Sequence, residues 1–472
     1  MHSPYFSTGV VMTSITINHS VKSEAKSILS ISIPLITSQI IFSMSGFIGT
    51  IMVAHLDKNA LAASVVVNLI WWTLSVLFIG LLNSTSVLVS QQQGAKNYEA
   101  ISLVMGQSFL LAFIIAVPVI LVMFIAPVFL KWSLQTPIVL NYARVYLHSL
   151  AWCMPGLLLI IVLEQFLAGL GRTKIVLAIS LLEVPFEIVL IYVLMFGKFH
   201  FPACGISGVG YGFTAAYTIT AVLLAVYLYY AKFAQPYGIY KRIGEFHLRY
   251  FLELVKIGWP IGLMYLIEVG AFAITTMLMA RFDSNVLAAH QIAFQYLGVT
   301  INIVFGMSQA VSTRIGQAAG RDDLMGVYYA AYVGMCLSFI VMFVIGLIYL
   351  FFPTLLIALD VNTHALMNAE LVKNAAILLG IIGLFQIFEN FRIIGVGALR
   401  GLKDTKIPML ISFISFWLIG IVCAYLFGFT FHLNGAGIWW GLTLGVAIGA
   451  LILFFRMKHI LAIVDLKEVV KI

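Results

Sequence analysis

The sequence predicts an all-α membrane protein with twelve transmembrane helices in two six-helix bundles. Three observations lead to this fold class: the composition, the length of the apolar segments and an internal repeat. Of the 472 residues, 62% are hydrophobic and only 9% are charged, and the mean hydropathy is +1.07. Because a soluble domain carries about a quarter charged residues, the composition excludes a soluble enzyme, a disordered scaffold and a DNA-binding protein.

The apolar segments have the length of membrane helices. A helix needs about 20 apolar residues to cross the hydrocarbon layer, and only helices or closed barrels satisfy their backbone hydrogen bonds there. The segments are too long for barrel strands. We therefore predict twelve helical spans, near residues 28–54, 60–89, 101–127, 141–168, 175–196, 206–231, 254–280, 286–313, 325–351, 370–399, 408–428 and 436–456.

The two ends of the chain are expected in the cytoplasm. Residues 1–27 form a mostly polar tail, and the apolar run after it exceeds the roughly 7 to 15 residues of a signal-peptide core. With this orientation, nineteen of the 26 Lys and Arg residues fall on inner loops and span ends, six fall on outer ones, and Arg392 lies within a span. This bias follows the positive-inside rule, so the net charge of +8 reflects topology. We expect no nucleic-acid partner.

An internal repeat divides the chain. Shifting the sequence by 226 residues aligns residues 50–63 with 276–289, with seven of fourteen positions identical. The same offset pairs Pro34 with Pro260, Gln91 with Gln317 and Gly94 with Gly320. Because each half has an even number of spans, the halves enter the membrane from the same side. We expect a pseudo-two-fold axis along the membrane normal and a ligand site between the halves.

The domain boundaries follow from this repeat. We predict an N-terminal tail (1–27), an N-terminal lobe (28–231), a cytoplasmic linker (232–253), a C-terminal lobe (254–457) and a C-terminal tail (458–472).

Charged residues inside spans are costly and mark candidate functional sites. Glu268 is the strongest candidate, since no basic residue stands within one turn of it in the sequence. Loading a proton or a sodium ion on such a carboxylate can bias a conformational equilibrium; the alternative is a protonated glutamic acid bonded to a neighbouring helix. Glu389 and Arg392 are spaced i, i+3 and share a helix face. Glu389 is therefore either a coupling residue or half of a structural salt bridge, with Arg392 as its partner.

A second group of acids lies in the span near 175–196. Glu183 and Glu187 flank Pro185 on one helix face, and a proline frees the carbonyl four residues back, here that of Leu181. The group could take a cation or substrate, or could consist of two protonated acids at a kink. Glu164 is expected to lie at the membrane interface, paired with Arg172.

Motifs of other protein classes are missing from the sequence. It contains no GxxxxGK[ST] phosphate-binding loop and no HExxH pattern, and the four cysteines are scattered without CxxC spacing. We therefore expect neither an enzyme nor a cofactor, beyond a proton or sodium as coupling ion.

Several short motifs together resemble the multidrug and toxic compound extrusion (MATE) family, in particular its NorM-type branch. They are Gln91-x-x-Gly94, Gln317-x-x-Gly320, Ala288-Ala289-His290-Gln291 and Leu399-Arg400-Gly401-Leu402-Lys403-Asp404. The resemblance covers about residues 28–457. It implies a V-shaped pair of bundles, monomeric and resident in the bacterial inner membrane, which exports organic, often cationic, compounds in exchange for sodium ions or protons. The alternative is a flippase for lipids or lipid-linked oligosaccharides, from the same superfamily.

The resemblance also assigns site residues. Glu268 and Glu389 match the acidic residues of the family's seventh and tenth spans, which implies that they hold the coupling cation, with sodium as one possibility. Gly49 stands where the family often has an aspartate, and Ile191 where it often has an acidic or amide residue. An N-lobe cation site would therefore have to be rebuilt from Glu183 and Glu187. The sequence leaves the choice of ion and the identity of the substrate open.

Overall fold

The structure is a computed structural model that describes residues 20–132, 136–363 and 365–472. Helices make up nearly all of it, and no strand occurs in these ranges. The helices are α1 (Val21–Ala54), α2 (Lys58–Leu82), α3 (Ser84–Gly94), α4 (Tyr98–Leu130), α5 (Pro137–Ala151), α6 (Met154–Gly169), α7 (Thr173–Phe196), α8 (Ser207–Tyr230), α9 (Leu248–Met279), α10 (Ser284–Gly320), α11 (Leu324–Phe351), α12 (Pro353–Ile357), α13 (Ala369–Gly401), α14 (Lys406–Phe413), α15 (Val422–Tyr425), α16 (Asn434–Ile463) and α17 (Leu466–Val470).

The predicted number of spans is confirmed. In the described part of the chain, eleven helices are long and apolar enough to cross a membrane, and α5 with α6 forms a twelfth span bent by 47°. Pro155 explains the bend, because its ring lacks an N–H group and clashes with the carbonyl four residues back, that of Ala151. The eleventh span, from Lys406 to Thr430, includes π-helical turns at Ile414–Ile421 and Leu426–Thr430.

The ends of the spans differ from the sequence expectation. Helix α1 begins at Val21, so the last residues of the predicted tail are helical, whereas residues 1–19 lie outside the described residues. Helix α9 begins at Leu248 and takes up the last part of the predicted linker. Hydropathy locates only the part of a helix that lies in lipid, and these helices continue as polar turns beyond it.

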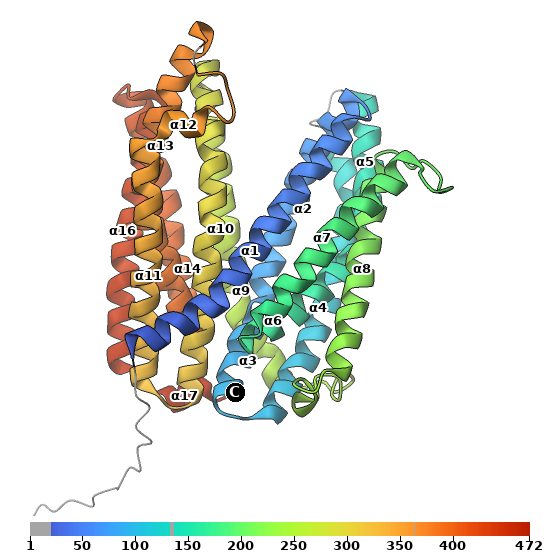
Figure 1. The fold of residues 1–472 in the computed structure, drawn as a ribbon, viewed down its shortest axis with the longest axis vertical. Coiled ribbons are helices and arrows are strands. Elements are labelled where there is room, and N and C mark those ends of the chain that lie inside the picture. The colour runs from blue at the N-terminus through green and yellow to red at the C-terminus, as the bar shows by residue number, and fades with distance from the viewer. Residues whose placement is uncertain (1–19, 133–135, 364) are drawn as a thin grey trace, which may run out of the picture.

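The helices form two lobes that diverge like a V (Figure 1). Helices α1 to α8 belong to one lobe and α9 to α16 to the other. The lobes meet at the end where α3, α17 and the C-terminus lie, and they separate toward the end with α5 and α12. We call these the closed end and the open end.

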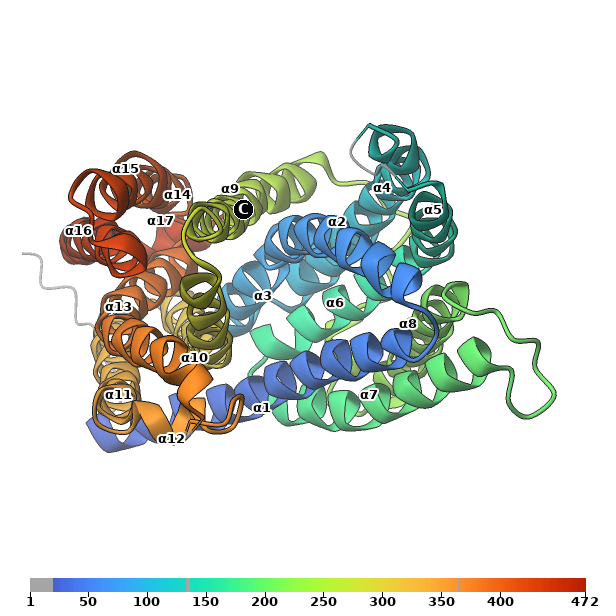
Figure 2. The same cartoon turned by 90° about the horizontal axis from the view of Figure 1, so that it is seen from above.

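The two halves are related by the predicted pseudo-symmetry. Helix α1 starts beside α10 and α11 of the other lobe and then runs along α7, as the view from above shows (Figure 2). Helix α9 repeats this course: it packs on α2 and α4 of the first lobe and on α14 of its own. Helices α2 and α4 begin at Lys58 and Tyr98, and α10 and α11 begin 226 residues later, at Ser284 and Leu324.

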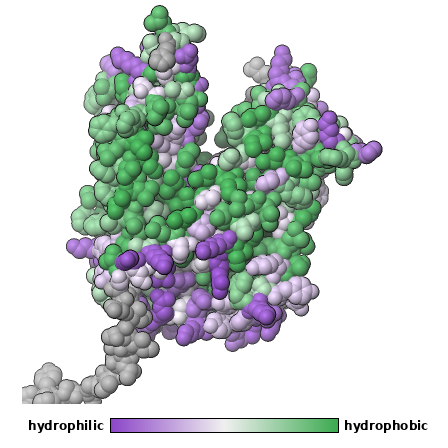
Figure 3. All heavy atoms as spheres, in the orientation of Figure 1, coloured by the Kyte–Doolittle hydropathy of each residue, from purple (hydrophilic) through white to green (hydrophobic). Residues whose placement is uncertain are grey.

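The surface has the polarity of a membrane protein. Hydrophobic residues cover the middle of both lobes, whereas hydrophilic residues gather in a band at the closed end and at the tips of the open end (Figure 3). Large apolar side chains such as Phe113 and Leu182 are 70% and 76% exposed. Lipid is the solvent in which so much exposed apolar surface carries no cost.

Candidate functional site

Three charged side chains meet inside the C-terminal lobe. Arg392 of α13 donates two hydrogen bonds to the carboxylate of Glu389, from Nε at 2.7 Å and from Nη2 at 2.5 Å. The same Nη2 donates to Oε2 of Glu268 on α9 at 2.8 Å. We call Glu268, Glu389 and Arg392 the C-lobe triad. Its residues are 6%, 1% and 1% exposed, so Glu268 retains the most exposed surface.

A third helix completes the surroundings of Arg392. Its Nη1 donates to the hydroxyl of Ser412 on α14 at 3.1 Å, and its guanidinium lies 4.9 Å from the centre of the Phe416 ring. Phe416 belongs to the π-helical turn that follows α14. Such turns are frequent at functional sites. The guanidinium is therefore held by two carboxylates, one hydroxyl and one aromatic face.

An aromatic layer covers the triad on the side of the open end. Phe272 follows Glu268 by one turn of α9, and Phe385 precedes Glu389 by one turn of α13. Because α9 runs toward the open end and α13 runs away from it, both rings lie on the same side of the triad. The ring centres of Phe272 and Phe385 are 6.3 Å apart, that of Phe416 lies 5.9 Å from Phe272, and that of Trp439 lies 5.4 Å from Phe385. These rings separate the triad from the outer part of the lobe.

The triad combines two carboxylates with one guanidinium. When all three groups are ionised, the cluster carries one negative charge that nothing in its described contacts neutralises. Burying a charge without a partner is strongly unfavourable. The arrangement can therefore take up one monovalent cation, either a proton on a carboxylate or a metal ion between carboxylate oxygens.

Two buried amide side chains lie within one turn of Glu389 along α13. Gln386 and Asn390 are buried, and Gln386 Oε1, Asn390 Oδ1 and Asn390 Nδ2 have no hydrogen-bond partner. Amide oxygens are suitable ligands for hard cations. Sequence reasoning missed these two residues, although both are polar residues in an apolar span.

The structure changes the picture of Glu268. In the sequence no basic residue stands within one turn of it, and the alternative was a protonated glutamic acid bonded to a neighbouring helix. Arg392, 124 residues later, is within salt-bridge distance. The predicted i, i+3 pair of Glu389 and Arg392 is formed, and it extends into a three-residue cluster.

The N-terminal lobe holds a second acidic cluster. Glu183 and Glu187 of α7 are 2% and 0% exposed, and Oε2 of each has no hydrogen-bond partner. Ser45 of α1 donates a hydrogen bond to Oε1 of Glu187. Helix α7 continues through Pro185 as a single element. The structure therefore brings the two predicted acids together with a hydroxyl from α1.

Glu164 belongs to this cluster, which corrects the sequence interpretation. It was expected at the membrane interface with Arg172. Its Oε1 is instead buried without a hydrogen-bond partner, and the side chain lies within electrostatic range of Glu183. Arg172 lies over the ring of Phe233, 5.0 Å from the ring centre. The predicted pair fails because Arg172 follows the end of α6, whereas Glu164 faces the lobe interior.

The closed end is joined by two symmetry-related hydrogen bonds. Gln91 Nε2, from α3, donates to the carbonyl of Gly401 at the end of α13 at 2.9 Å. Gln317 Nε2, from α10, donates to the carbonyl of Gly169 at the end of α6 at 3.3 Å. Each bond links one lobe to the other. The sequence singled out both glutamines as repeated motif residues but did not indicate this role.

Further polar contacts lie between these two bonds. Gln309 of α10 donates to Ser86 of α3 at 2.9 Å and accepts a hydrogen bond from Arg400 at 3.1 Å. At the edge, Arg314 of α10 forms a salt bridge of 2.7 Å with Glu24 at the start of α1. When the lobes separate, these polar groups can exchange their contacts for contacts with water.

Comparison with a protein family matches both lobes. Residues 34–193 and 260–426 each match the MatE family model. The two matches begin 226 residues apart, which is the offset of the internal repeat.

Relatives of the chain cover nearly all of it. A Rhizobium meliloti (strain 1021) protein with the name Probable multidrug resistance protein NorM is 32% identical over 436 residues, which are 92% of this chain and 93% of that protein. A protein of the same name from Pseudomonas putida is 31% identical over 443 residues, 93% and 96% of the two chains. These relatives are not named as enzymes, in agreement with the prediction.

Solved structures share the fold. An outward-facing multidrug resistance MATE family transporter of the MOP superfamily matches with a TM-score of 0.83 and 19% identity, over 93% of this chain and 96% of that one. A MATE structure in the straight conformation matches with a TM-score of 0.83 and 20% identity, over 94% and 97%. The family model, the relatives and the fold agree, and the chain therefore belongs to the MatE family.

Proposed function

We propose that this protein is a secondary antiporter that exports organic, often cationic, compounds in exchange for protons or sodium ions. The observation that carries the proposal is the composition of the C-lobe triad: two buried carboxylates share one guanidinium. One monovalent cation neutralises the excess charge. A site that gains and loses one charge can drive a conformational equilibrium, since ion binding favours the state with the higher affinity.

The organic substrate binds between the lobes in this proposal. The names of the relatives, multidrug resistance proteins, support a broad range of small organic substrates. Polar side chains also join the two lobes: Asn302 of α10 donates a 3.2 Å hydrogen bond to Ser43 of α1. The protein acts as a monomer in this proposal.

The V shape corresponds to an outward-open state. The loops of the closed end carry most of the basic residues, among them Arg242, Arg321 and Lys403. The positive-inside rule assigns these loops to the cytoplasm, which agrees with both termini being cytoplasmic and with residence in a bacterial inner membrane. Inward opening then requires the hydrogen bonds of Gln91 and Gln317 to break while the open end closes.

The N-lobe acids form a second cation site in this proposal. Glu164, Glu183 and Glu187 have buried oxygens without hydrogen-bond partners, and Ser45 supplies a hydroxyl. Carboxylates buried in this way bind protons or cations because their ionised forms are costly. This cluster would replace the aspartate that Gly49 displaces.

Counterflow in vesicles tests the function. Purified protein is reconstituted with a fluorescent organic cation, and proton and sodium gradients are imposed separately. We expect one of the two gradients to drive uphill transport and Glu268→Gln to abolish it. Glu370→Gln is the control, because it makes the same chemical change in an exposed acid at the start of α13. Ion conduction would show a channel instead. Transport that depends on neither gradient would show a passive carrier.

A further inference from the structure

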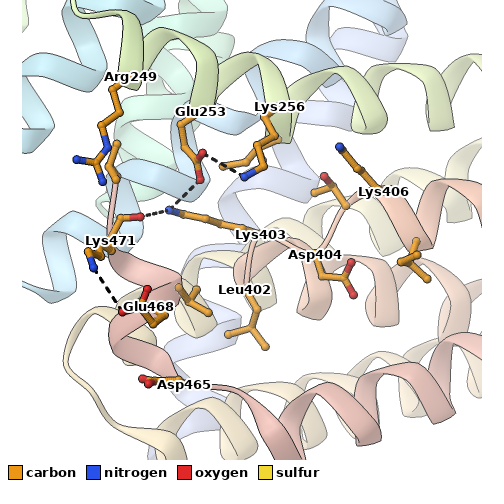
Figure 4. A pocket seen from close by; sticks show the side chains of 15 residues that line it. Arg249, Glu253, Lys256, Leu402, Lys403, Asp404, Lys406, Asp465, Glu468 and Lys471 are labelled. Carbon is orange, nitrogen blue, oxygen red and sulfur yellow. Dashed lines mark hydrogen bonds and ion pairs between the residues drawn. The ribbon is translucent and has the colours of Figure 1, made fainter.

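A charged pocket lies at the closed end, lined by charged side chains that Figure 4 shows. It has a volume of about 720 Å³ and lies between the start of α9, the α13–α14 loop and α17. Arg249, Lys256, Lys403, Lys406 and Lys471 are its basic lining residues, and Glu253, Asp404, Asp465 and Glu468 are its acidic ones. None of these residues belongs to the C-lobe triad or to the N-lobe cluster.

The acidic side chains are already engaged. Asp404 pairs with Arg456, which does not line the pocket, at 3.0 Å, and Asp465 accepts a hydrogen bond from the backbone N–H of Lys467 at 3.0 Å. The remaining pairs are Glu468 with Lys471 at 3.5 Å, and Glu253 with Lys403 at 3.2 Å and Lys256 at 3.8 Å.

The charged lining side chains are five basic and four acidic, so one positive charge is left over. Arg249 and Lys406 have no ion-pair or hydrogen-bond partner among the described residues, and Figure 4 shows both without a dashed contact. The pKa of Lys403 also reflects the nearby positive charges. Burial lowers the pKa of its ammonium group, Glu253 opposes this, and the nearby charges of Lys256 and Arg249 lower the pKa further. The pocket therefore favours an anion.

A buried hydroxyl lines the same pocket without a partner. Thr405 is 5% exposed, and its Oγ1 has no hydrogen-bond partner. Thr405 also occupies the N-cap position of α14, where its side chain makes no capping bond. The first amides of a helix have no partner within the helix and carry partial positive charge. Hydroxyl, amides and basic side chains together are the donors that a phosphate group requires.

An apolar surface continues from the pocket toward the membrane. Ile407 lines the pocket and is 39% exposed, and Leu410 on the next turn of α14 is 50% exposed. Helix α9 packs beside α14 and exposes Leu252 and Trp259, by 53% and 39%. A charged cavity next to exposed apolar side chains matches the two parts of a phospholipid, the headgroup and the acyl chains.

We propose that this pocket binds a phosphate group, supplied by the headgroup of an anionic phospholipid whose acyl chains lie along α9 and α14. Basic pockets between transmembrane helices on the cytoplasmic side are suited to such headgroups. The test measures lipid binding itself, so it does not depend on transport activity.

Native mass spectrometry of the full chain measures this binding. The protein is titrated in detergent with cardiolipin, with phosphatidylglycerol and with phosphatidylcholine. We expect the two anionic lipids to bind more tightly than phosphatidylcholine. Arg249→Gln with Lys406→Gln should weaken anionic lipid binding by about thirtyfold, because each basic residue beside the bound headgroup contributes roughly fivefold. Lys174→Gln with Lys458→Gln removes the same charge from exposed sites of the same end and should leave binding unchanged.

A second variant and a second ligand decide the source of the phosphate. Thr405→Val keeps the shape of the side chain but removes the hydroxyl, so it should weaken the anionic lipids without changing phosphatidylcholine binding. Inorganic phosphate is titrated in parallel and should compete only weakly. Competition by inorganic phosphate together with equal binding of all three lipids would overturn the lipid source. Equal lipid binding by the wild type and both pocket variants would overturn the site itself.

Discussion

Arg392 Nη2 lies 2.8 Å from Oε2 of Glu268, although 124 residues separate the two in the sequence. This contact joins α9 to α13. It extends the pair of Glu389 and Arg392 to a triad with two carboxylates and one guanidinium. It explains how two carboxylates can stay together inside a lipid-embedded lobe: the guanidinium neutralises one, and a transported cation can neutralise the other.

Arg392 should be essential for the stability of the C-terminal lobe. Arg392→Met leaves two buried carboxylates without a positive partner, and breaking a buried ion pair costs about 3–5 kcal/mol. We expect a large fall in the melting temperature in detergent. The double variant Arg392→Met with Glu389→Gln removes one unpaired charge together with the base and should recover much of the loss. Equal melting of single and double variants would contradict this account.

The two inter-lobe glutamines should control the conformational equilibrium. Gln91→Leu with Gln317→Leu removes two hydrogen bonds of about 0.5–1.5 kcal/mol each, so the ratio of inward-open to outward-open protein should rise by about five- to 150-fold. Distances between spin labels at Lys96→Cys and Lys458→Cys report the separation of the lobes at the closed end. The control is Gln291→Leu, an exposed residue near the open end, and it should leave these distances as in the wild type.

The N-lobe cluster should raise the number of ions exchanged per substrate molecule. Glu183→Gln with Glu187→Gln replaces two buried acids by neutral side chains of the same shape, so the fold should be retained while a cation site is lost. The reversal potential of transport in proteoliposomes measures the number of ions exchanged per substrate. We expect this number to fall in the double variant, and an unchanged value would rule out a coupling role for these residues.

His290 should act as a structural connection among three helices. Its Nδ1 accepts a hydrogen bond from Trp439 Nε1 at 3.2 Å, and its Nε2 lies 3.1 Å from Thr276 Oγ1. Because Thr276 Oγ1 also donates to Phe272 O at 3.1 Å, we assign the imidazole proton to Nε2. His290→Ala leaves a buried indole N–H without an acceptor, at a cost of about 1–3 kcal/mol.

A double-mutant cycle isolates that contact. Trp439→Phe removes the indole N–H, so His290→Ala should cost less in this background than in the wild type. The melting temperatures of the four proteins give the coupling. Additive effects of the two substitutions would mean that the hydrogen bond contributes little.

The sequence by itself determined the membrane fold. Hydropathy marked Glu268, Glu389, Glu183 and Glu187 as acids inside spans, and their role stays a prediction. Together with the 226-residue repeat, hydropathy also predicted the twelve spans and the two related halves. These predictions succeed because lipid imposes the same requirement on every span: apolar side chains outside and backbone hydrogen bonds within. The motif residues Gln91 and Gln317 were also visible as repeats.

Only the tertiary structure decided which side chains meet. The partnership of Glu268 with Arg392, the place of Glu164 beside Glu183 and the bonds of Gln91 and Gln317 to the other lobe depend on how helices rotate and cross. A helix face is set by packing against neighbours far away in the sequence, and small residues such as Gly94 and Gly320 let α3 and α10 approach closely. Hydropathy cannot predict the rotation of a helix, because it measures how apolar a span is. It does not say which neighbouring helix each face of the span contacts.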